Sequence, residues 1–321
     1  MIIVPEREIA ELISASDCFV AVERVFASMA KKSACNFPVI REAIGHTDAL
    51  YGFKSGFDRE SLALGLKSGG FWPNNTAKGL TNHQSTVFLF DADTGKCRAM
   101  VGGNLLTALR TAAASSVSIK YLARSDAKVL GMIGAGHQST FQLRAALDVH
   151  PFDKVVGWNI QPEGLDRLAS VAAERDVPFE VVDLDRLGSE ADVIITITSS
   201  FAPTLKAAHI RPGTHLACMG TDTKGKQEVE AELLAAATIF TDEIGQSITI
   251  GEAQHAVGKG LVSAERIVEI GAVINGRHPG RSSAEEITLF DGTGVGLQDL
   301  AVASAAAELA VQKGVAIQVD F

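Results

Sequence analysis

Between residues 128 and 243 the chain alternates strand-like and helix-like segments, which constrains its fold more than any other feature. KVLGMIGAG at 128–136 is typical of a buried strand that ends in a glycine turn, and 137–150 of a helix ended by Pro151. Further strands are predicted at 154–159, 179–183, 191–198, 214–220 and 238–243, and further helices at 162–176 and 228–237. Such alternation forms βαβ units and a parallel sheet. The sequence therefore predicts an α/β fold with a Rossmann-type, doubly wound sheet.

The segments on either side of this region do not show the same regular alternation of strands and helices. STVFLFD at 85–91 and CRAMVGG at 97–103 predict a hairpin, and 104–123 a long Ala-rich helix. After the last predicted strand, 286–291, a second Ala-rich helix is expected at 297–313. We expect two domains: a Rossmann domain at 121–296 and a discontinuous α+β domain made of 1–120 and 297–321.

Composition narrows the possible partners. The chain has 321 residues, 46% of them apolar, so it can fill the cores of about two domains. Its 29 Lys and Arg against 38 Asp and Glu give a formal charge of −9. An acidic chain without a basic block is a poor ligand for nucleic acid or for a membrane surface. An anionic ligand would need positive charge gathered at one place.

Cysteines and histidines give no metal signature. The four cysteines contain no C-x-x-C pair and the eight histidines no H-x-x-x-H pair, so we predict no metal site. We also find no basic segment followed by an apolar one at the N-terminus, and no run of 18 apolar residues. We expect a soluble cytoplasmic protein with reduced thiols.

The turn after the first Rossmann strand carries a dinucleotide fingerprint. Gly134, Gly136 and Ser139 form G-x-G-x-x-S between a predicted strand and a predicted helix. The first Gly permits a tight turn, the second lets a pyrophosphate approach the backbone, and the third position needs a small residue. The N-terminus of the helix offers free N–H groups to the phosphates. The context favours nucleotide binding over a purely structural turn.

The end of the next strand bears on the choice of cofactor. NAD enzymes usually place an acidic residue there, and NADP enzymes add a nearby Arg. Here Asn159 can accept a bond from the ribose, and Ile160, Gln161 and Pro162 follow without a basic residue close in sequence. We therefore expect NAD (NADH) rather than NADP. The hydroxyl residues Thr198-Ser199-Ser200 follow a strand and either line the cofactor site or form an ordinary loop.

Four basic residues lie in apolar or Gly-rich surroundings: Arg41, Lys54, Lys67 and Arg110. Composition alone favours a surface role for each, because Lys and Arg often extend from apolar surroundings into water.

Several stretches together resemble the ornithine cyclodeaminase/mu-crystallin family: GLKSGG, NHQSTVFLFDADTGKCRAMVGGNLLTALRTAAASSVSIKYLA, GMIGAGHQS, GTDTKGKQE and FDGTGVGLQDLAVA. They occur in order over about residues 38 to 310. Within the family, NFPVIREAIGHTDALYGFK, GGFWPNN and MGTDTKGKQE resemble most the members that reduce iminosuccinate in the β-hydroxyaspartate pathway. The resemblance implies a Rossmann domain, a substrate-binding and dimerisation domain, and a homodimer.

The resemblance also implies roles for residues. Arg41 and Arg110 match arginines that clamp the substrate α-carboxylate, for which a guanidinium fork is well shaped. Lys67 matches a lysine beside the reacting centre, and Asp222 the acidic residue that faces the reacting nitrogen. The implied cofactor-binding residues are Arg110, Thr111, Gly134, Gly136, His137, Gln138, Ser139, Asn159, Thr198, Ser199, Ser200, Met219, Gly220, Asp222 and Thr293. Asp291 belongs to the same segment as Thr293.

The activity implied is reduction of the small dicarboxylic imino acid iminosuccinate to L-aspartate, by hydride transfer from NADH to the imine carbon. Its distal carboxylate would need a further cation or donor, for which His83, Ser85 and Lys54 are candidates. The alternatives within the family are an ornithine cyclodeaminase, an alanine dehydrogenase and a cyclic ketimine reductase. The alternative of another class is a non-catalytic NAD(P)-dependent binding protein.

Overall fold

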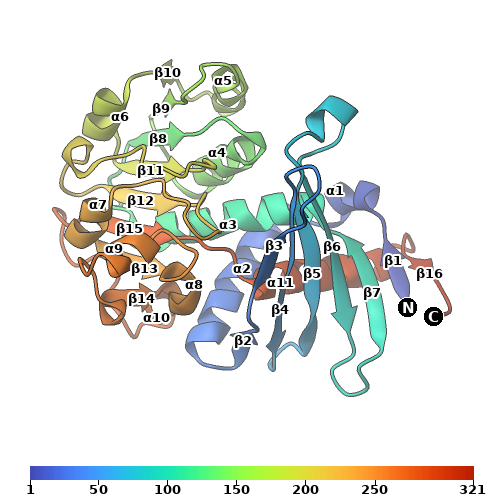
Figure 1. The fold of residues 1–321 in the computed structure, drawn as a ribbon. Helices are drawn as coiled ribbons and strands as arrows, with labels where there is room; N and C mark the ends of the chain where they lie inside the picture. Colours follow the sequence, from blue (N-terminus) through green and yellow to red (C-terminus); the bar gives the residue numbers. More distant parts are fainter. The chain divides into compact units, whose positions relative to one another are not determined.

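A computed structural model describes all residues, 1–321, as two compact units. The first unit comprises Met1–Arg110 and Val295–Phe321, and the second Thr111–Gly294. The first boundary follows Arg110, in the middle of helix α3 (Asn104–Leu122), whereas the sequence analysis expected it at residue 120, near the end of the same helix. Each unit has its own eight-stranded sheet (Figure 1).

The sheet of the first unit has the order β16-β1-β7-β6-β5-β4-β2, with β3 paired to β4. Its strands are β1 (Ile2–Val4), β2 (Ala34–Asn36), β3 (Ile40–Ala43), β4 (Leu50–Asp58), β5 (Ala63–Phe71), β6 (His83–Phe90), β7 (Cys97–Gly102) and β16 (Ile317–Gln318). The predicted hairpin is confirmed, because β6 and β7 pair antiparallel. Strand β16 follows the segment 286–291, which the sequence analysis took for the last strand.

One face of this sheet is covered by helix α11 (Gly296–Gln312), which crosses behind β4–β7 in Figure 1. Helix α2 (Ala15–Ala30) packs on α11 and begins with a capping box, in which Ser14 and Asp17 satisfy each other's backbone N–H groups. The short helix α1 (Ile9–Leu12) also contacts α11. The helix-covered face of the sheet carries fully buried residues such as Val87, Leu89 and Val101.

The other face of the same sheet is apolar and has no helix over it. Along the central strands its side chains alternate with the buried ones and are only half-buried. They include Phe53, Phe57, Leu64, Leu66, Phe88, Phe90 and Met100. An uncovered apolar sheet face of this kind is typical of a surface that packs against another protein.

The second unit contains the predicted Rossmann-type sheet, which is parallel throughout and has the order β10-β9-β8-β11-β12-β15-β13-β14. Its strands are β8 (Val129–Ile133), β9 (Lys154–Trp158), β10 (Phe179–Val181), β11 (Val193–Thr196), β12 (His215–Cys218), β13 (Thr238–Thr241), β14 (Ile267–Glu269) and β15 (Thr288–Asp291). Its helices after α3 are α4 (His137–Val149), α5 (Leu165–Ala173), α6 (Leu184–Glu190), α7 (Ala231–Ala236), α8 (Ile244–Ser247), α9 (Gln254–Gly258) and α10 (Ile270–Ile274).

The strand order reverses at β8. The chain runs outward from β8 through β9 to β10 and then returns to β11 on the other side of β8. Ligands of open α/β sheets bind outside the carboxyl ends of the strands at such a reversal. The carboxyl end of β8 leads into Gly134, the first glycine of the fingerprint. The carboxyl end of the neighbouring strand β11 leads into Thr198.

Two predicted helices are shorter than expected. The helix predicted at 162–176 begins only at Leu165, because Gly164 has φ +97°, a left-handed conformation outside a helix. The helix predicted at 228–237 begins at Ala231, because the backbone N–H groups of Glu228 and Val229 donate to Glu252 instead of entering a helical turn.

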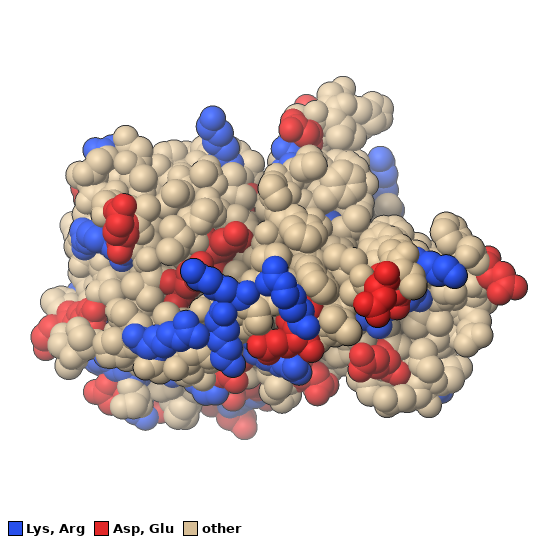
Figure 2. Space-filling model, turned by 90° about the horizontal axis from the view of Figure 1, so that it is seen from below, with Lys and Arg blue, Asp and Glu red and all other residues tan.

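No helix is long and apolar enough to cross a membrane. On the face seen in Figure 2, acidic and basic side chains lie among uncharged ones and neither sign covers the surface alone.

Candidate active site

The four basic residues singled out in the sequence lie in one place in the first unit. On β5, Lys67 shares a face with Gly65, where an added Cβ would lie 2.9 Å from Leu300 of α11, so Lys67 is on the helix-covered face. Lys54 on β4 is directly opposite Lys67, and Arg41 on β3 is opposite Gly52, two residues before Lys54. His83 and Ser85 on β6 share this face, because they pair with residues 71 and 69 of β5.

The centre of this cluster is Asp299, on α11, which the sequence analysis did not single out. Its Oδ2 lies 2.9 Å from Nζ of Lys67, and its Oδ1 accepts a hydrogen bond of 3.0 Å from Nε of Arg110 on α3. Arg110 also donates to Oε1 of Gln298 at 3.1 Å. Asp299 and Gln298 are fully buried, and the two cations are 6% exposed. One carboxylate therefore holds two of the predicted site cations, Lys67 and Arg110, in fixed positions.

The electrostatics of the cluster follow from burial and from the gathering of cations. Burial lowers the pKa of the Lys67 ammonium to about 7; Asp299 opposes this shift, and Arg110 and Lys54 add to it. Burial alone would raise the pKa of Asp299, but Arg110 and Lys67 outweigh it, so this pKa is lowered. Burial, Lys67 and Arg110 lower the pKa of His83 to about 3, which leaves a neutral imidazole. The concentration of positive charge suits the cluster to binding a further anionic group.

The glycine loop of the second unit fits a dinucleotide. Gly134 has φ +104°, and an added Cβ would lie 2.6 Å from the carbonyl oxygen of Ile197, so the tight turn requires glycine. Gly136, the N-cap of α4, has no atom within 4 Å of an added Cβ, which leaves open space at the helix N-terminus. Ser139 is buried and donates to the carbonyl of Gly136 at 2.7 Å. Beside them, Oε1 of Gln138 is buried without a partner.

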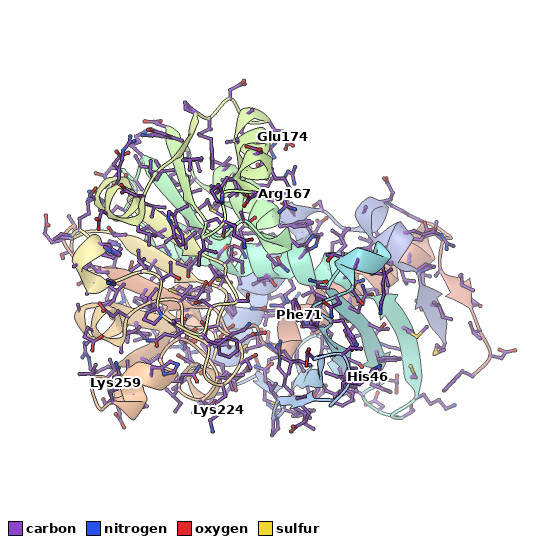
Figure 3. The ribbon with its side chains drawn as sticks, turned by 45° about the horizontal axis from the view of Figure 1, so that its top comes forward. His46, Phe71, Arg167, Glu174, Lys224 and Lys259 are labelled. Carbon is purple, nitrogen blue, oxygen red and sulfur yellow. The ribbon has the colours of Figure 1, made fainter.

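A cation, Arg167, contacts the glycine loop, although it is not close to Asn159 in the sequence. Asn159 donates its amide N–H to the carbonyl of Gln161 at 2.6 Å, which leaves its amide oxygen as an acceptor. Arg167, which is labelled on α5 in Figure 3, donates to the carbonyl of Ala135 in the glycine loop at 2.7 Å. No basic residue is close to Asn159 in the sequence, but α5 brings Arg167 to the glycine loop itself.

Several predicted cofactor residues have internal partners. Thr198 gives both its N–H and its hydroxyl to Glu228, and Ser200 donates its hydroxyl to the carbonyl of Ala202. Thr293 donates its N–H and hydroxyl to Asp242, directly after β13. Of the remaining predicted residues, Thr111 and Met219 are buried, Gly220 donates its N–H to Glu228, and His137 and Ser199 are exposed. The roles of these residues stay predictions.

Asp222 lies in the loop after β12 and forms an ion pair with Lys226, with 2.9 Å between Oδ1 and Nζ. Its side chain is 30% exposed, so the carboxylate remains accessible. Asp291, at the end of β15, is fully buried, and burial raises its pKa to about 7.

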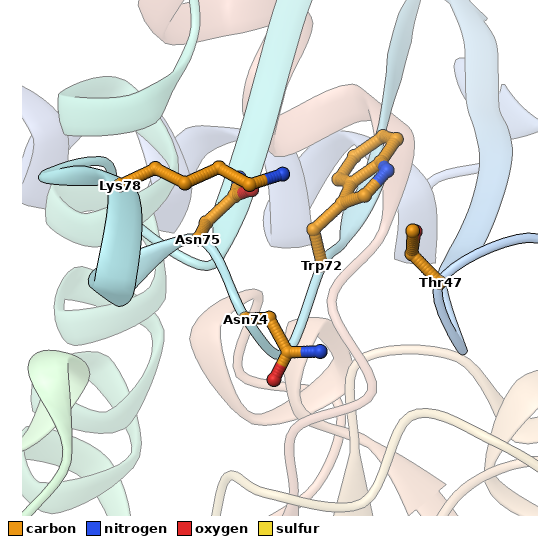
Figure 4. Close-up of a pocket in the computed structure, with 5 residues that line it drawn as sticks. All are labelled: Thr47, Trp72, Asn74, Asn75 and Lys78. Carbon is orange, nitrogen blue, oxygen red and sulfur yellow. The ribbon is translucent and has the colours of Figure 1, made fainter.

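A hollow of about 270 Å³ in the first unit is lined by Thr47, Trp72, Asn74, Asn75 and Lys78 (Figure 4). None of these residues belongs to the predicted site, and no carboxylate, imidazole or thiol lies on the wall of the hollow. The hollow is therefore not a candidate for a catalytic centre.

Comparison with known proteins places the chain among enzymes of similar size. The chain is 65% identical over its full length, and over the full length of the relative, to the iminosuccinate reductase of Paracoccus denitrificans. The crystal structure of that enzyme in complex with NAD+ has a TM-score of 0.96, with 64% identity over 100% of this chain and 99% of that one.

Two further structures are similar over at least 99% of both chains. The Δ(1)-pyrroline-2-carboxylate reductase of Thermococcus litoralis, in complex with NADH and L-proline, has a TM-score of 0.93 and 27% identity. An archaeal alanine dehydrogenase dimer with bound NAD has a TM-score of 0.93 and 33% identity. The profile of the ornithine cyclodeaminase/mu-crystallin family matches residues 2–314. The chain therefore belongs to the ornithine cyclodeaminase/mu-crystallin family.

Proposed function

We propose that this protein is an NADH-dependent reductase that converts iminosuccinate to L-aspartate. The observation that carries the proposal is the full-length identity of 65% to an iminosuccinate reductase. The gathering of four cations, two of them paired with one buried carboxylate, supports it, because iminosuccinate has two carboxylates to neutralise. A protein of this family that acts on a substrate with a distal amino group would need negative charge there instead.

The substrate α-carboxylate binds to Arg110, Lys67 and Arg41. Arg110 is already held by Asp299 and Gln298, so binding does not have to order its long side chain. A guanidinium donates parallel hydrogen bonds to a carboxylate, which orients the reacting carbon as well as binding it. Lys67 adds a charge in a buried place, where electrostatic attraction is stronger than in water.

The distal carboxylate binds to Lys54, with His83 and Ser85 as neutral donors beside it. Lys54 is directly opposite Lys67 on the neighbouring strand, so the two ammonium groups belong to one face of the sheet. His83 is neutral and can donate one N–H without adding charge.

When bound, NADH supplies the hydride that is added to the imine carbon. The chain's own contribution is to hold the imine nitrogen in its protonated form, which accepts a hydride more readily than a neutral imine. Asp222 stabilises that cationic nitrogen. Addition of the hydride leaves a neutral amine, which takes one further proton from water to become the ammonium of L-aspartate. Lys67 either stays on the carboxylate or supplies a proton through water, and a group placed this way contributes about 10²–10⁴-fold in rate. The positioning of the two reactants and the fixed charges of the site contribute the larger share of the rate enhancement.

NAD is the cofactor rather than NADP. The open space at Gly136 and the N-terminus of α4 accommodate a pyrophosphate, and Asn159 offers an acceptor to the ribose. Arg167 is engaged with the carbonyl of Ala135. The similar structures from Paracoccus and Thermococcus and the archaeal alanine dehydrogenase hold NAD+, NADH and NAD, respectively.

The protein acts as a homodimer, joined through the uncovered apolar face of the first unit's sheet. Phe53, Phe57, Leu66, Phe88 and Phe90 are only half-buried there, and a second copy of the same face would exclude water from them. The similar archaeal alanine dehydrogenase is a dimer. Light scattering is expected to give the mass of two chains.

Steady-state assays test the proposed function. Iminosuccinate formed from oxaloacetate and ammonia should be reduced with NADH, and L-aspartate should appear in equal amount. NADPH should serve poorly. Release of ammonia and formation of proline from ornithine, at higher kcat/KM than iminosuccinate reduction, would refute the substrate assignment.

A further inference from the structure

Two buried glutamates that the proposed reaction does not use hold the loop that carries Asp222. This loop runs from Gly220 to Glu228. Glu228 is 1% exposed, and Glu252, from the segment before α9, is fully buried. Between them they contact both ends of the loop, so they are placed to set the position of Asp222.

Glu228 accepts four hydrogen bonds, which stabilise its ionised form against the burial that raises its pKa. Its Oε1 accepts from the N–H of Thr198 at 2.7 Å and from the Thr198 hydroxyl at 2.8 Å. Its Oε2 accepts from the N–H of Gly220 at 2.7 Å and from the Thr196 hydroxyl at 2.8 Å. A proton on either oxygen would have to reverse a hydrogen bond that a threonine hydroxyl now donates, because the backbone N–H on that oxygen can only donate. One carboxylate thus ties the ends of β11 and β12 together.

Glu252 has a different set of partners. Its Oε1 accepts from the N–H groups of Glu228, at 2.9 Å, and Val229, at 2.8 Å. Its Oε2 contacts the hydroxyl of Thr221, a group that can accept as well as donate, and the N–H of Glu228 at a longer 3.2 Å. Glu252 can therefore carry a proton on Oε2 and donate it to Thr221, while its Oε1 keeps both N–H bonds. Each oxygen of Glu228 accepts a backbone N–H bond of 2.7 Å, so the proton is held more readily by Glu252 than by Glu228.

The surroundings of Glu252 favour the protonated form. Three titratable groups face Glu252. They are Glu228 at the end of the Asp222 loop, Asp291 at the end of β15 and the buried thiol of Cys218 at the end of β12. None of these groups is a cation. Burial first, and then the charge of Glu228, raise the pKa of Glu252 to about 8.

We propose that Glu252 is a positioning residue which, as a neutral carboxyl group, holds Thr221 and so fixes Asp222 for the reaction. This inference rests on the proposed function, because Asp222 is assigned there to the reacting nitrogen. The pair consists of one carboxylate, Glu228, and one carboxyl group, Glu252. Loss of the proton from Glu252 places a second negative charge in the buried site and removes the donor to Thr221, which loosens the loop.

A matched pair of amide variants tests which acid carries the proton. Glu252→Gln keeps an acceptor for the two N–H groups and a donor for Thr221, so kcat at pH 7 should stay within about three-fold of the wild type. Glu228→Gln presents an N–H₂ group to a backbone donor, so kcat should fall by about ten-fold or more. The exposed Glu265→Gln is the control and should match the wild type.

The pH profile separates positioning from a merely structural role. With both substrates saturating, kcat of the wild type should fall above about pH 8, and Glu252→Gln should lack that fall. An unchanged alkaline fall in Glu252→Gln would overturn the proposal, and so would equal damage from the two amide variants.

A stability measurement keeps this test independent of the substrate. Because the pKa of Glu252 in the folded protein is above its ordinary value of 4.5, the folded state binds this proton more tightly than the unfolded state does. The contribution of Glu252 to the free energy of unfolding therefore decreases as pH rises from about 4.5 to 8. The stability of Glu252→Gln relative to the wild type should rise across that window, even if iminosuccinate proves not to be the substrate. An unchanged difference between the two proteins would overturn the proposal.

Discussion

The ammonium of Lys67 on β5 lies 2.9 Å from the carboxylate of Asp299 on α11, and both side chains are buried. The same carboxylate binds Arg110, so two of the three predicted substrate-binding cations share one anionic support. Without that support, cations on facing elements would repel one another in a buried place. The ion pair therefore explains how the fold keeps positive charge ready for an anionic substrate.

Replacing Asp299 by Asn should destabilise the first unit strongly. Removing one partner of a buried ion pair leaves the other charges uncompensated and costs about 3–5 kcal/mol. Urea unfolding should show a loss of this size, and kcat/KM should fall as well. Asp93→Asn, at the exposed hairpin turn, is the control and should change neither quantity. A loss below about 1 kcal/mol in Asp299→Asn, the range of exposed pairs, would mean that Asp299 does not support the cluster.

The pH dependence of kcat/KM should report Lys67. Burial lowers the pKa of its ammonium to about 7, so the free enzyme loses this positive charge as pH rises through neutrality. Binding of the substrate carboxylate should weaken correspondingly, and kcat/KM should fall above about pH 7. Arg remains charged at these pH values, so Lys67→Arg should have lower activity but no decline near pH 7. The same decline in Lys67→Arg would assign it to another group.

The two glycines of the nucleotide loop should respond differently to alanine. At Gly136 a Cβ meets no protein atom, so Gly136→Ala should change stability by only about 0.5 kcal/mol, yet weaken NADH binding by about ten-fold or more. At Gly134 the positive φ and the close carbonyl of Ile197 should make alanine cost about 1–3 kcal/mol. Fluorescence titration with NADH and urea unfolding measure both effects. Wild-type NADH affinity in Gly136→Ala would contradict the assigned pyrophosphate site.

Lys54 should determine selectivity for a dicarboxylate. Lys54→Ala should lower kcat/KM for iminosuccinate by about ten-fold or more, because a buried carboxylate loses its cation. The imine of pyruvate has no distal carboxylate, so its kcat/KM should change by less than about three-fold. The exposed Lys96→Ala is the matched control. Equal losses with both substrates would place Lys54 outside the distal subsite.

The Rossmann unit could be predicted from local patterns, because its strands are covered on both faces and appear as apolar runs between helices. Of the strands of the first unit, local patterns predicted the β6–β7 hairpin but not β4 and β5. β4 and β5 contain glycines where a strand normally has side chains, and their reason is tertiary: an added Cβ at Gly65 would clash with the carbonyl oxygen of Phe88 and lie 2.9 Å from Leu300. No local pattern shows that α11 approaches the sheet so closely.

The same limit applies to the site. Lys67 and Arg110 are recognisable from family motifs, and the structure brings them together. Asp299 was missed because an acid in the first turn of an Ala-rich helix has an ordinary local explanation, favourable interaction with the helix dipole. Its partners lie on β5 and α3, far away in the chain. Glu252 was missed for a similar reason, since its hydrogen bonds join segments with no shared motif.

Transfer of deuterium tests the central claim most directly. With NADH carrying deuterium at the transferable position of C4, and with iminosuccinate as substrate, mass spectrometry and NMR of the product should find one deuterium at Cα of L-aspartate. Aspartate without deuterium at Cα, or oxidation of NADH without formation of aspartate, would contradict hydride transfer to the imine carbon.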